Sequence, residues 1–188
     1  MFRRCLRYSG CGNGSRSNDI KADDLMDNNN ALVIRDATEK DVSLILNFIK
    51  QLATYEKLLH EVVATEELLH ESLFVKNHAR VIIAEFEGVP VGFALYFFNF
   101  STFVGRPGLY LEDLFVYPEM RGKGIGKALL SRLAGIAISN GCGRFEWSCL
   151  DWNEPSIKFY KSLGAVAMED WTIYRVTGDA LVNLANGK

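Results

Sequence analysis

The sequence has few of the residues that build metal or redox centres. It contains three histidines and four cysteines, and no two cysteines are spaced as Cys-x-x-Cys. His60 and His70 each start a His-Glu-x-x-His pattern, but Ala64 and Phe74 stand where the second histidine is needed. We therefore expect no metal site, and we expect free thiols in a reducing compartment.

Neither sign of charge dominates the chain. The formal net charge is -2, and residues 1–18 contain four arginines and no acid, so the remainder carries -6. Such a body has no basic field for nucleic acid, which makes nucleic-acid binding unexpected. The mild acidity instead favours a cationic small molecule as the ligand.

A long, purely apolar run is also missing. Gly88 to Gly105 has no charged residue, but Pro90 lies near its start and Asn99 near its end. A membrane-spanning helix needs about 20 mostly apolar residues, whereas a stretch rich in Phe and Tyr, with a proline near its start and polar residues at its end, fits an extended strand better. No membrane partner is expected.

The composition changes at residue 31. Residues 1–30 are poor in apolar residues, and their early arginines resemble a transit peptide. The alternatives are a disordered leader or true initiation at Met26. Cytoplasm is the expected compartment, with import into an organelle as the alternative. Residues 31–188 are expected to form one domain.

Hydrophobic periodicity predicts a mixed α/β order, βααβββαβαββ. Thr38 and Asp41 have capping-box spacing at the start of the first helix. The expected buried face of this helix comprises Val42, Ile45, Leu46, Ile49, Leu52 and Ala53. The other expected elements are strands 32–34, 80–87, 91–103, 109–116 and 144–150, helices 65–74, 124–140 and 155–164, a turn at 105–108, and two short strands before a final helical turn.

A glycine-rich loop separates a strand from the longest expected helix. It reads Arg121-Gly122-Lys123-Gly124-Ile125-Gly126, with Lys127 next. Unobstructed backbone N–H groups at a helix N-terminus attract phosphate, so an anion site is expected there. The alternative is that the glycines only form a tight turn. The spacing fits neither a P-loop nor the dinucleotide fingerprint.

This loop resembles the acetyl-CoA motif R/Q-x-x-G-x-G/A of the GNAT N-acetyltransferases. The chain is similar to the spermidine/spermine and thialysine acetyltransferase branch over residues 31–186. The segments that carry the similarity are Val33–Arg35 with Ala37-Thr38, Ala53–Glu56, Leu109–Val116, Arg121–Gly126 and Trp152–Lys161. The resemblance implies the GNAT fold, a single α/β domain whose central twisted mixed sheet is flanked by helices. Acetyl-CoA is implied as cosubstrate, and a homodimer as the assembly.

The resemblance also assigns site residues. Those implied to bind acetyl-CoA are Leu114, Phe115, Val116, Arg121, Gly122, Lys123, Gly124, Ile125, Gly126, Lys127, Asn153, Glu154, Pro155 and Ser156. Those implied to bind the amine are Tyr55, Glu56, Glu112 and Asp113. The segments 105–107 and 146–148 diverge from that branch.

Acetyl transfer needs a neutral amine and a proton for the departing thiolate. A phenol is protonated at neutral pH, and the resemblance makes Tyr160 the general acid. From periodicity alone, Tyr160 would pack with Ile157 and Leu163. Glu112 is implied to help remove the amine proton, directly or through water. The alternative for Glu112 and Asp113 is a structural ion pair or hydrogen bond.

The predicted function is therefore acetyl-CoA-dependent N-acetylation of a small cationic amine by direct attack on the thioester. Cys149 has no legible histidine–acid pair, so an acyl-enzyme is not expected. The alternatives are a coenzyme-A-binding sensor that has lost catalysis, or a lysine acetyltransferase of proteins. The sequence does not choose among polyamines, diamines and thialysine-like amines.

Overall fold

The structure is a computed structural model that describes residues 31–188. The leader expected over residues 1–30 lies outside the described residues. The chain divides into two compact units, Met1–Glu146 and Trp147–Lys188.

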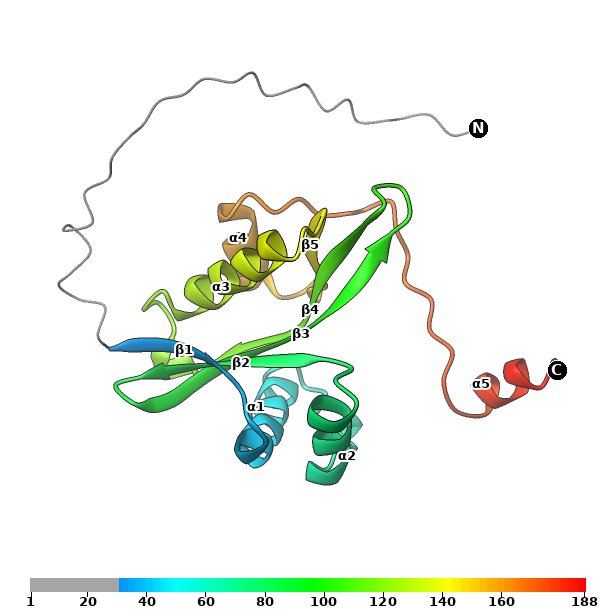
Figure 1. Ribbon diagram of the computed structural model, residues 1–188, viewed down its shortest axis with the longest axis horizontal. Coiled ribbons are helices and arrows are strands. Elements are labelled where there is room, and N and C mark those ends of the chain that lie inside the picture. The colour runs from blue at the N-terminus through cyan, green and yellow to red at the C-terminus, as the bar shows by residue number, and fades with distance from the viewer. Residues whose placement is uncertain (1–30) are drawn as a thin grey trace, which may run out of the picture. The chain divides into compact units, whose positions relative to one another are not determined.

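A five-stranded mixed sheet organises the first unit, with the strand order β1-β2-β3-β4-β5. The strands are β1 (Leu32–Asp36), β2 (Arg80–Phe86), β3 (Val89–Ser101), β4 (Arg106–Val116) and β5 (Arg144–Trp147). The first four are antiparallel neighbours. Helices α1 (Val42–Tyr55) and α2 (Glu66–His70) cover one face of the sheet, and α3 (Ile125–Ser139) covers the other (Figure 1).

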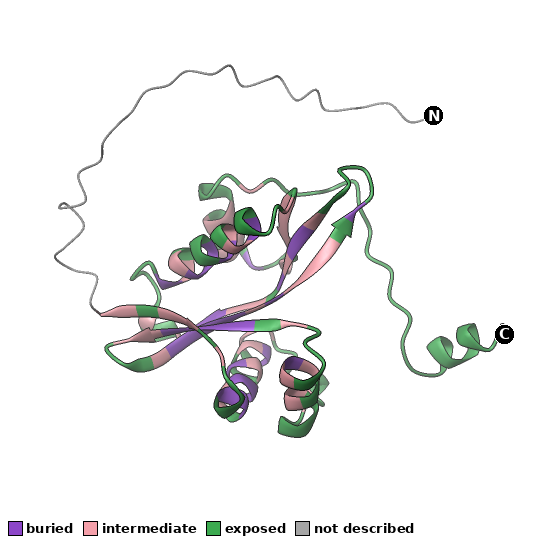
Figure 2. Cartoon of the chain, in the orientation of Figure 1, coloured by how far each residue is buried: buried purple, intermediate pink, exposed green. Residues whose placement is uncertain are grey.

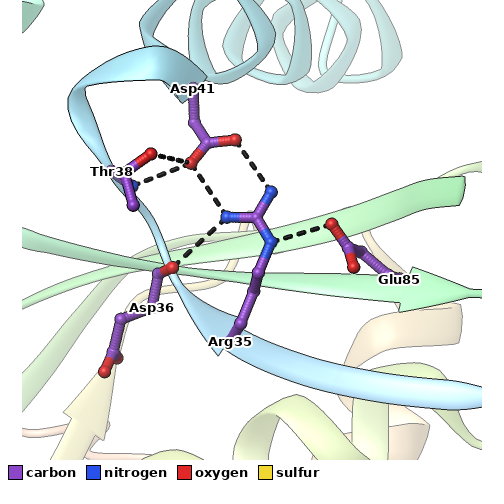
Figure 3. A network of polar contacts seen from close by, with 5 residues as sticks. All are labelled: Arg35, Asp36, Thr38, Asp41 and Glu85. Carbon is purple, nitrogen blue, oxygen red and sulfur yellow. Dashed lines mark hydrogen bonds and ion pairs between the residues drawn. The ribbon is translucent and has the colours of Figure 1, made fainter. Parts of the chain in front are cut away.

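The start of α1 is fixed by an ionic capping network (Figure 3). Asp41 accepts hydrogen bonds from the Thr38 backbone N–H at 2.8 Å and from its hydroxyl at 2.9 Å. The Arg35 guanidinium donates to both carboxylate oxygens of Asp41 at 2.8 Å, and its Nε donates to Glu85 at 2.8 Å. These charge-assisted bonds link β1, β2 and the first turn of the helix. The predicted capping box is confirmed, although a 3-10 turn (Glu39–Asp41) precedes the α-helix.

The buried face of α1 packs on the sheet through aromatic rings. Phe48 is fully buried, with its ring centroid 5.2 Å from Phe93, 6.1 Å from Phe115 and 5.4 Å from Tyr117. Figure 2 shows the buried residues concentrated on α1 and the central strands. Of the predicted face, Val42, Ile45, Leu46 and Ala53 are buried, and Ile49 and Leu52 are partly buried. Phe48, which packs against these three rings, was missed.

The predicted hairpin is confirmed as β2 and β3, joined by a two-residue turn. Glu87 and Gly88 both have positive φ, at 53° and 77°, as a type I′ hairpin turn requires. The predicted turn at 105–108 is wrong, because β4 begins at Arg106. Pro107 pairs with Phe100 in the ladder, and the reversal lies at residues 102–105.

The second unit contains helices α4 (Glu154–Ser162) and α5 (Gly178–Ala185). The two short strands predicted before the C-terminal helix are wrong, because none of the described residues 163–177 is in a strand.

The α2 helix of the first unit is shorter than predicted and continues as a π-helical turn, Glu71–Val75. Within the described chain, every helix is too short or too polar to span a lipid bilayer.

Candidate active site

A β-bulge in β4 presents two adjacent acids. Leu111 pairs with Tyr96 of β3, and Asp113 pairs with Leu95, so Glu112 is an extra residue in the ladder. A bulge interrupts the alternation of side chains and re-aims them. Glu112 is accordingly exposed, while Asp113 is partly buried.

Three carboxyl groups from two elements interact at this bulge. The pKa of Asp113 is raised to about 6, mainly by burial and in addition by the negative charges of Glu112 and Glu56. Burial also raises the pKa of Glu56, at the end of α1. The structure therefore brings together the three acids that the sequence analysis assigned to the amine. A cation placed among them would offset their mutual repulsion.

The end of α1 that carries Tyr55 and Glu56 is closed by a Schellman-type turn. The N–H of Leu58 donates to the carbonyl of Ala53 at 2.8 Å, and that of Lys57 donates to Thr54 at 3.1 Å. Lys57 has φ 63°, in the left-handed region that favours glycine. The two hydrogen bonds close the helix directly after the Tyr55-Glu56 pair.

The N-terminus of α3 is open to an anion. Gly122 and Gly124 have φ of 78° and 80°, and a Cβ at either position would meet no atom within 4 Å. Gly124 is the N-cap, and no side chain caps this end of the 15-residue helix among the described residues. The first backbone N–H groups of α3 are therefore available to phosphate oxygens.

The remaining loop residues differ in their surroundings. Ile125 is buried and anchors the first turn of α3, while Lys127 is exposed. The ammonium of Lys123 lies over the Phe86 ring, 5.1 Å from its centroid, and 3.5 Å from the Met120 sulfur. Lys123 thus has partners within the protein, although it is exposed like Lys127.

Arg121 contacts both the sheet and α1. Its Nε donates to the Val116 carbonyl at 3.1 Å, and its guanidinium carbon lies 4.7 Å from the centroid of the Tyr55 ring. The two residues are far apart in sequence, so no local pattern signals this contact. The sequence implies a site role for both residues but gives no sign that they meet.

The strand residues Leu114 to Val116 lie in the last part of β4, which leads toward the glycine loop. Phe115 and Val116 are buried, and Val116 pairs with Gly92 of β3. A Cβ on Gly92 would lie 2.6 Å from the Phe115 carbonyl oxygen, so only glycine permits this close approach of the strands.

In the second unit, Asn153 begins α4. It is 7% exposed, and its side-chain oxygen accepts a hydrogen bond from the Ser156 N–H at 3.4 Å. Glu154 and Pro155 lie in the first turn of the helix, and Glu154 pairs with Lys158 at 3.3 Å. These four residues of the predicted cofactor set therefore share one helix N-terminus.

Tyr160 lies on α4 in an aromatic cluster. Its ring centroid is 5.1 Å from that of Trp147 and 5.5 Å from that of Phe159. This packing fixes the plane of the phenol ring.

In the part of the chain that the structure describes, no three His, Cys, Asp or Glu side chains are grouped to hold a metal ion.

Comparisons with known proteins place these features in a family. The model of the acetyltransferase (GNAT) family matches residues 47–165. The chain belongs to the GNAT acetyltransferase family. This assignment confirms the predicted fold class and the resemblance on which it rested.

Several curated relatives of this GNAT chain are named N-acetyltransferases. The thialysine N-epsilon-acetyltransferase of Sus scrofa is 39% identical over 82% of this chain and 98% of its own length. The L-ornithine N5-acetyltransferase of Arabidopsis thaliana is 32% identical over 79% of this chain and 85% of its own length. The prediction of an N-acetyltransferase is therefore confirmed.

A solved structure extends the comparison to the fold. An integron cassette protein from the mobile metagenome of V. cholerae has a TM-score of 0.69 and 32% identity. The alignment covers 82% of this GNAT chain and 98% of that protein. The match spans nearly all of the described GNAT fold.

Proposed function

We propose that this enzyme transfers the acetyl group of acetyl-CoA to a small amine that carries a second positive charge. The observation that carries the proposal is the cluster of three acids, Glu56, Glu112 and Asp113. The negative charges of Glu112 and Glu56 both raise the pKa of Asp113. A diamine, polyamine or thialysine-like substrate supplies the cation that relieves this repulsion. The names of the thialysine and ornithine relatives support the same class of amine.

The residues at the N-terminus of α3 fit the pyrophosphate of coenzyme A. GNAT enzymes use acetyl-CoA, and this helix end has an uncapped turn, two glycines that leave open space, and the exposed Lys127. Backbone N–H groups from Gly122 to Lys127 would bind the phosphate oxygens. Acetyl-CoA supplies an acetyl group already activated as a thioester.

The side chains supply proton transfer and charge. Glu112, directly or through water, accepts the proton of the attacking nitrogen, while Glu56 and Asp113 hold the distal ammonium. The nitrogen bonds to the acetyl carbon as the C–S bond breaks, and the Tyr160 hydroxyl protonates the departing sulfur. Leu114 to Val116 and Asn153 to Ser156 would bind the rest of coenzyme A. Residues 31–188 are proposed as the transferase domain and a homodimer as the assembly, by family resemblance.

A substrate panel tests the function. Release of the coenzyme A thiol is measured with a diamine, with thialysine, with a monoamine of the diamine's length and with a lysine peptide. We expect the highest kcat/KM for the diamine or thialysine. Coenzyme A binding without turnover of any amine would favour the sensor alternative, and preferential turnover of the peptide would favour protein acetylation.

A substitution at the helix N-terminus tests the coenzyme site. Gly124→Glu should abolish coenzyme A binding in calorimetry, because a carboxylate would lie where phosphate binds. Gly124→Asn controls for backbone strain, since asparagine tolerates left-handed φ without adding charge. Gly135→Glu, at an exposed position farther along α3 with open space, should leave the affinity unchanged. Normal affinity in a folded Gly124→Glu variant would place the site elsewhere.

A further inference from the structure

Arg121 connects three parts of the first unit that the proposed function uses. It belongs to the glycine loop, it donates to the carbonyl of Val116 at the end of β4, and its cation lies over the ring of Tyr55 at the end of α1. Tyr55 directly precedes Glu56. One side chain thus joins the coenzyme loop to the helix end that carries an acid of the amine site.

The charge of Arg121 has no carboxylate partner among residues 31–188: the ion pairs of this part of the chain involve other residues. Its guanidinium is therefore committed to one carbonyl and one ring face. A planar guanidinium stacks on an aromatic ring, whereas an ammonium or an amide reproduces this geometry poorly. The contact therefore depends on a guanidinium at position 121 and an aromatic ring at position 55.

We propose that Arg121 is a positioning residue for the amine, acting through Tyr55, and that it couples coenzyme binding to amine binding. This inference rests on the proposed function. Phosphate held at the N-terminus of α3 restricts the loop, and with it the stem of Arg121. The guanidinium then fixes the ring of Tyr55, so the Tyr55-Glu56 pair is set before the amine arrives.

The size of the effect follows from the contact. A cation–π contact at an exposed site corresponds to about a two- to fivefold change in an equilibrium constant. Coenzyme A should therefore tighten amine binding by a factor of this order, and the amine should tighten coenzyme binding by the same factor, because binding free energies are linked reciprocally.

The experiment compares amine affinity with and without coenzyme A, by calorimetry with a diamine, in the full chain. Arg121→Gln keeps a polar donor that the loop motif accepts but removes the cation from the ring. Tyr55→Leu removes the ring, and Tyr55→Phe retains it. Arg132→Gln removes an exposed arginine of α3 and serves as the control for net charge. Steady-state KM for the diamine and kcat are measured on the same proteins.

We expect Arg121→Gln and Tyr55→Leu each to reduce the coenzyme-induced tightening by about two- to fivefold. Their double variant should be no worse than either alone, Tyr55→Phe should preserve the coupling, and KM for the diamine should change more than kcat. Equal coupling in wild type and Arg121→Gln, or additive effects of the two substitutions, would overturn the inference. Turnover by the wild type separates the two claims. If the wild type is active but Arg121→Gln shows the same coupling, only this inference is removed. If the wild type acetylates no amine, the proposed function is removed.

Discussion

The ring of Trp147 packs against the ring of Tyr160 with centroids 5.1 Å apart and planes inclined by 58°. The packing involves the rings, whereas the proposed chemistry involves only the phenol hydroxyl. The structural and catalytic roles of Tyr160 can therefore be separated by a substitution that removes one oxygen atom.

Tyr160→Phe should lower kcat by about 10²- to 10⁴-fold, the usual contribution of a general acid, with a much smaller effect on KM for acetyl-CoA. The measurement is steady-state thiol release at neutral pH. Tyr174→Phe is the matched control, because Tyr174 is a 91% exposed tyrosine of the same unit. A loss under about threefold, with chemistry rate-limiting, would reduce Tyr160 to a packing residue.

Much of the first unit could be predicted from local patterns, but its contacts could not. Hydrophobic periodicity located α1 and α3, and alternation located the β2–β3 hairpin. Phe48 satisfies the i+3 spacing from Ile45, so a wider face would have included it. Patterns within a window carry no information about Arg121 and Tyr55, which meet only through the fold.

The errors in the prediction have physical causes. Residues 171–176 contain Trp171, Ile173 and Val176, which favour strands. A strand also needs a neighbouring strand to pair with, and the propensity of its own residues does not provide one. The bulge at Glu112 was not foreseen either, because an extra residue leaves no signature in a run of apolar residues broken by two acids. Adjacent residues of a regular strand face opposite sides of the sheet, but at Glu112 and Asp113 the ladder is locally out of register.

Asp113→Asn should stabilise the protein at neutral pH. The pKa of Asp113 in the folded state is about 6, above its usual value near 4, so the native state binds the proton more tightly than the unfolded state. Stability is therefore lost as pH rises from about 4 through 6. We expect a gain of about 1–2 kcal/mol in unfolding free energy at pH 7.5 and almost none at pH 4.

Urea denaturation at the two pH values measures this difference. Asp36→Asn, at an exposed aspartate of β1, should change stability by less than about 0.5 kcal/mol at both. An Asp113→Asn variant that is less stable than wild type at pH 7.5 would show that the carboxylate makes a favourable interaction in the folded protein.

Asp41 should show the opposite pH dependence. The hydrogen bonds from Arg35 and Thr38 lower the pKa of Asp41 to about 2, so its contribution is complete above about pH 4 and is lost as pH falls toward 2. Asp41→Asn should cost about 2 kcal/mol at pH 7 and less at pH 3. Arg35→Lys keeps the positive charge but loses the paired hydrogen bonds of the guanidinium to Asp41. It should give a smaller loss of unfolding free energy in the same urea titrations. A pH-independent effect of Asp41→Asn would mean that capping geometry, rather than charge, stabilises this turn.

Lys57→Gly should stabilise the protein by about 0.5–1 kcal/mol. Glycine relieves about 1–2 kcal/mol of left-handed strain, offset by about 0.5–1 kcal/mol of additional entropy in the unfolded chain. Thermal and urea unfolding measure the change. Lys50→Gly, within the exposed face of α1, should instead destabilise by about 1 kcal/mol. Destabilisation by both substitutions would show that the Lys57 side chain makes a contact worth more than its strain.

Glu56→Gln should distinguish substrates by charge. It should raise KM for a diamine while barely changing that for a monoamine of equal length, because only the diamine carries a distal ammonium. Glu61→Gln, at an exposed acid just beyond the end of α1, is the control. Initial rates with both amines give the comparison, and equal effects on the two would remove Glu56 from the amine site.

The proposed amine site and the proposed coenzyme site share a single strand. β4 carries the bulge with Glu112 and Asp113, and it continues into the turn that delivers the glycine loop to α3. A change of register in β4 is therefore expected to disturb both proposed sites at once. The largely exposed connection between α1 and α2, residues 57–65, contains none of the proposed coenzyme-binding residues. Libraries for altered amine preference should be built in that connection, with β4 kept constant.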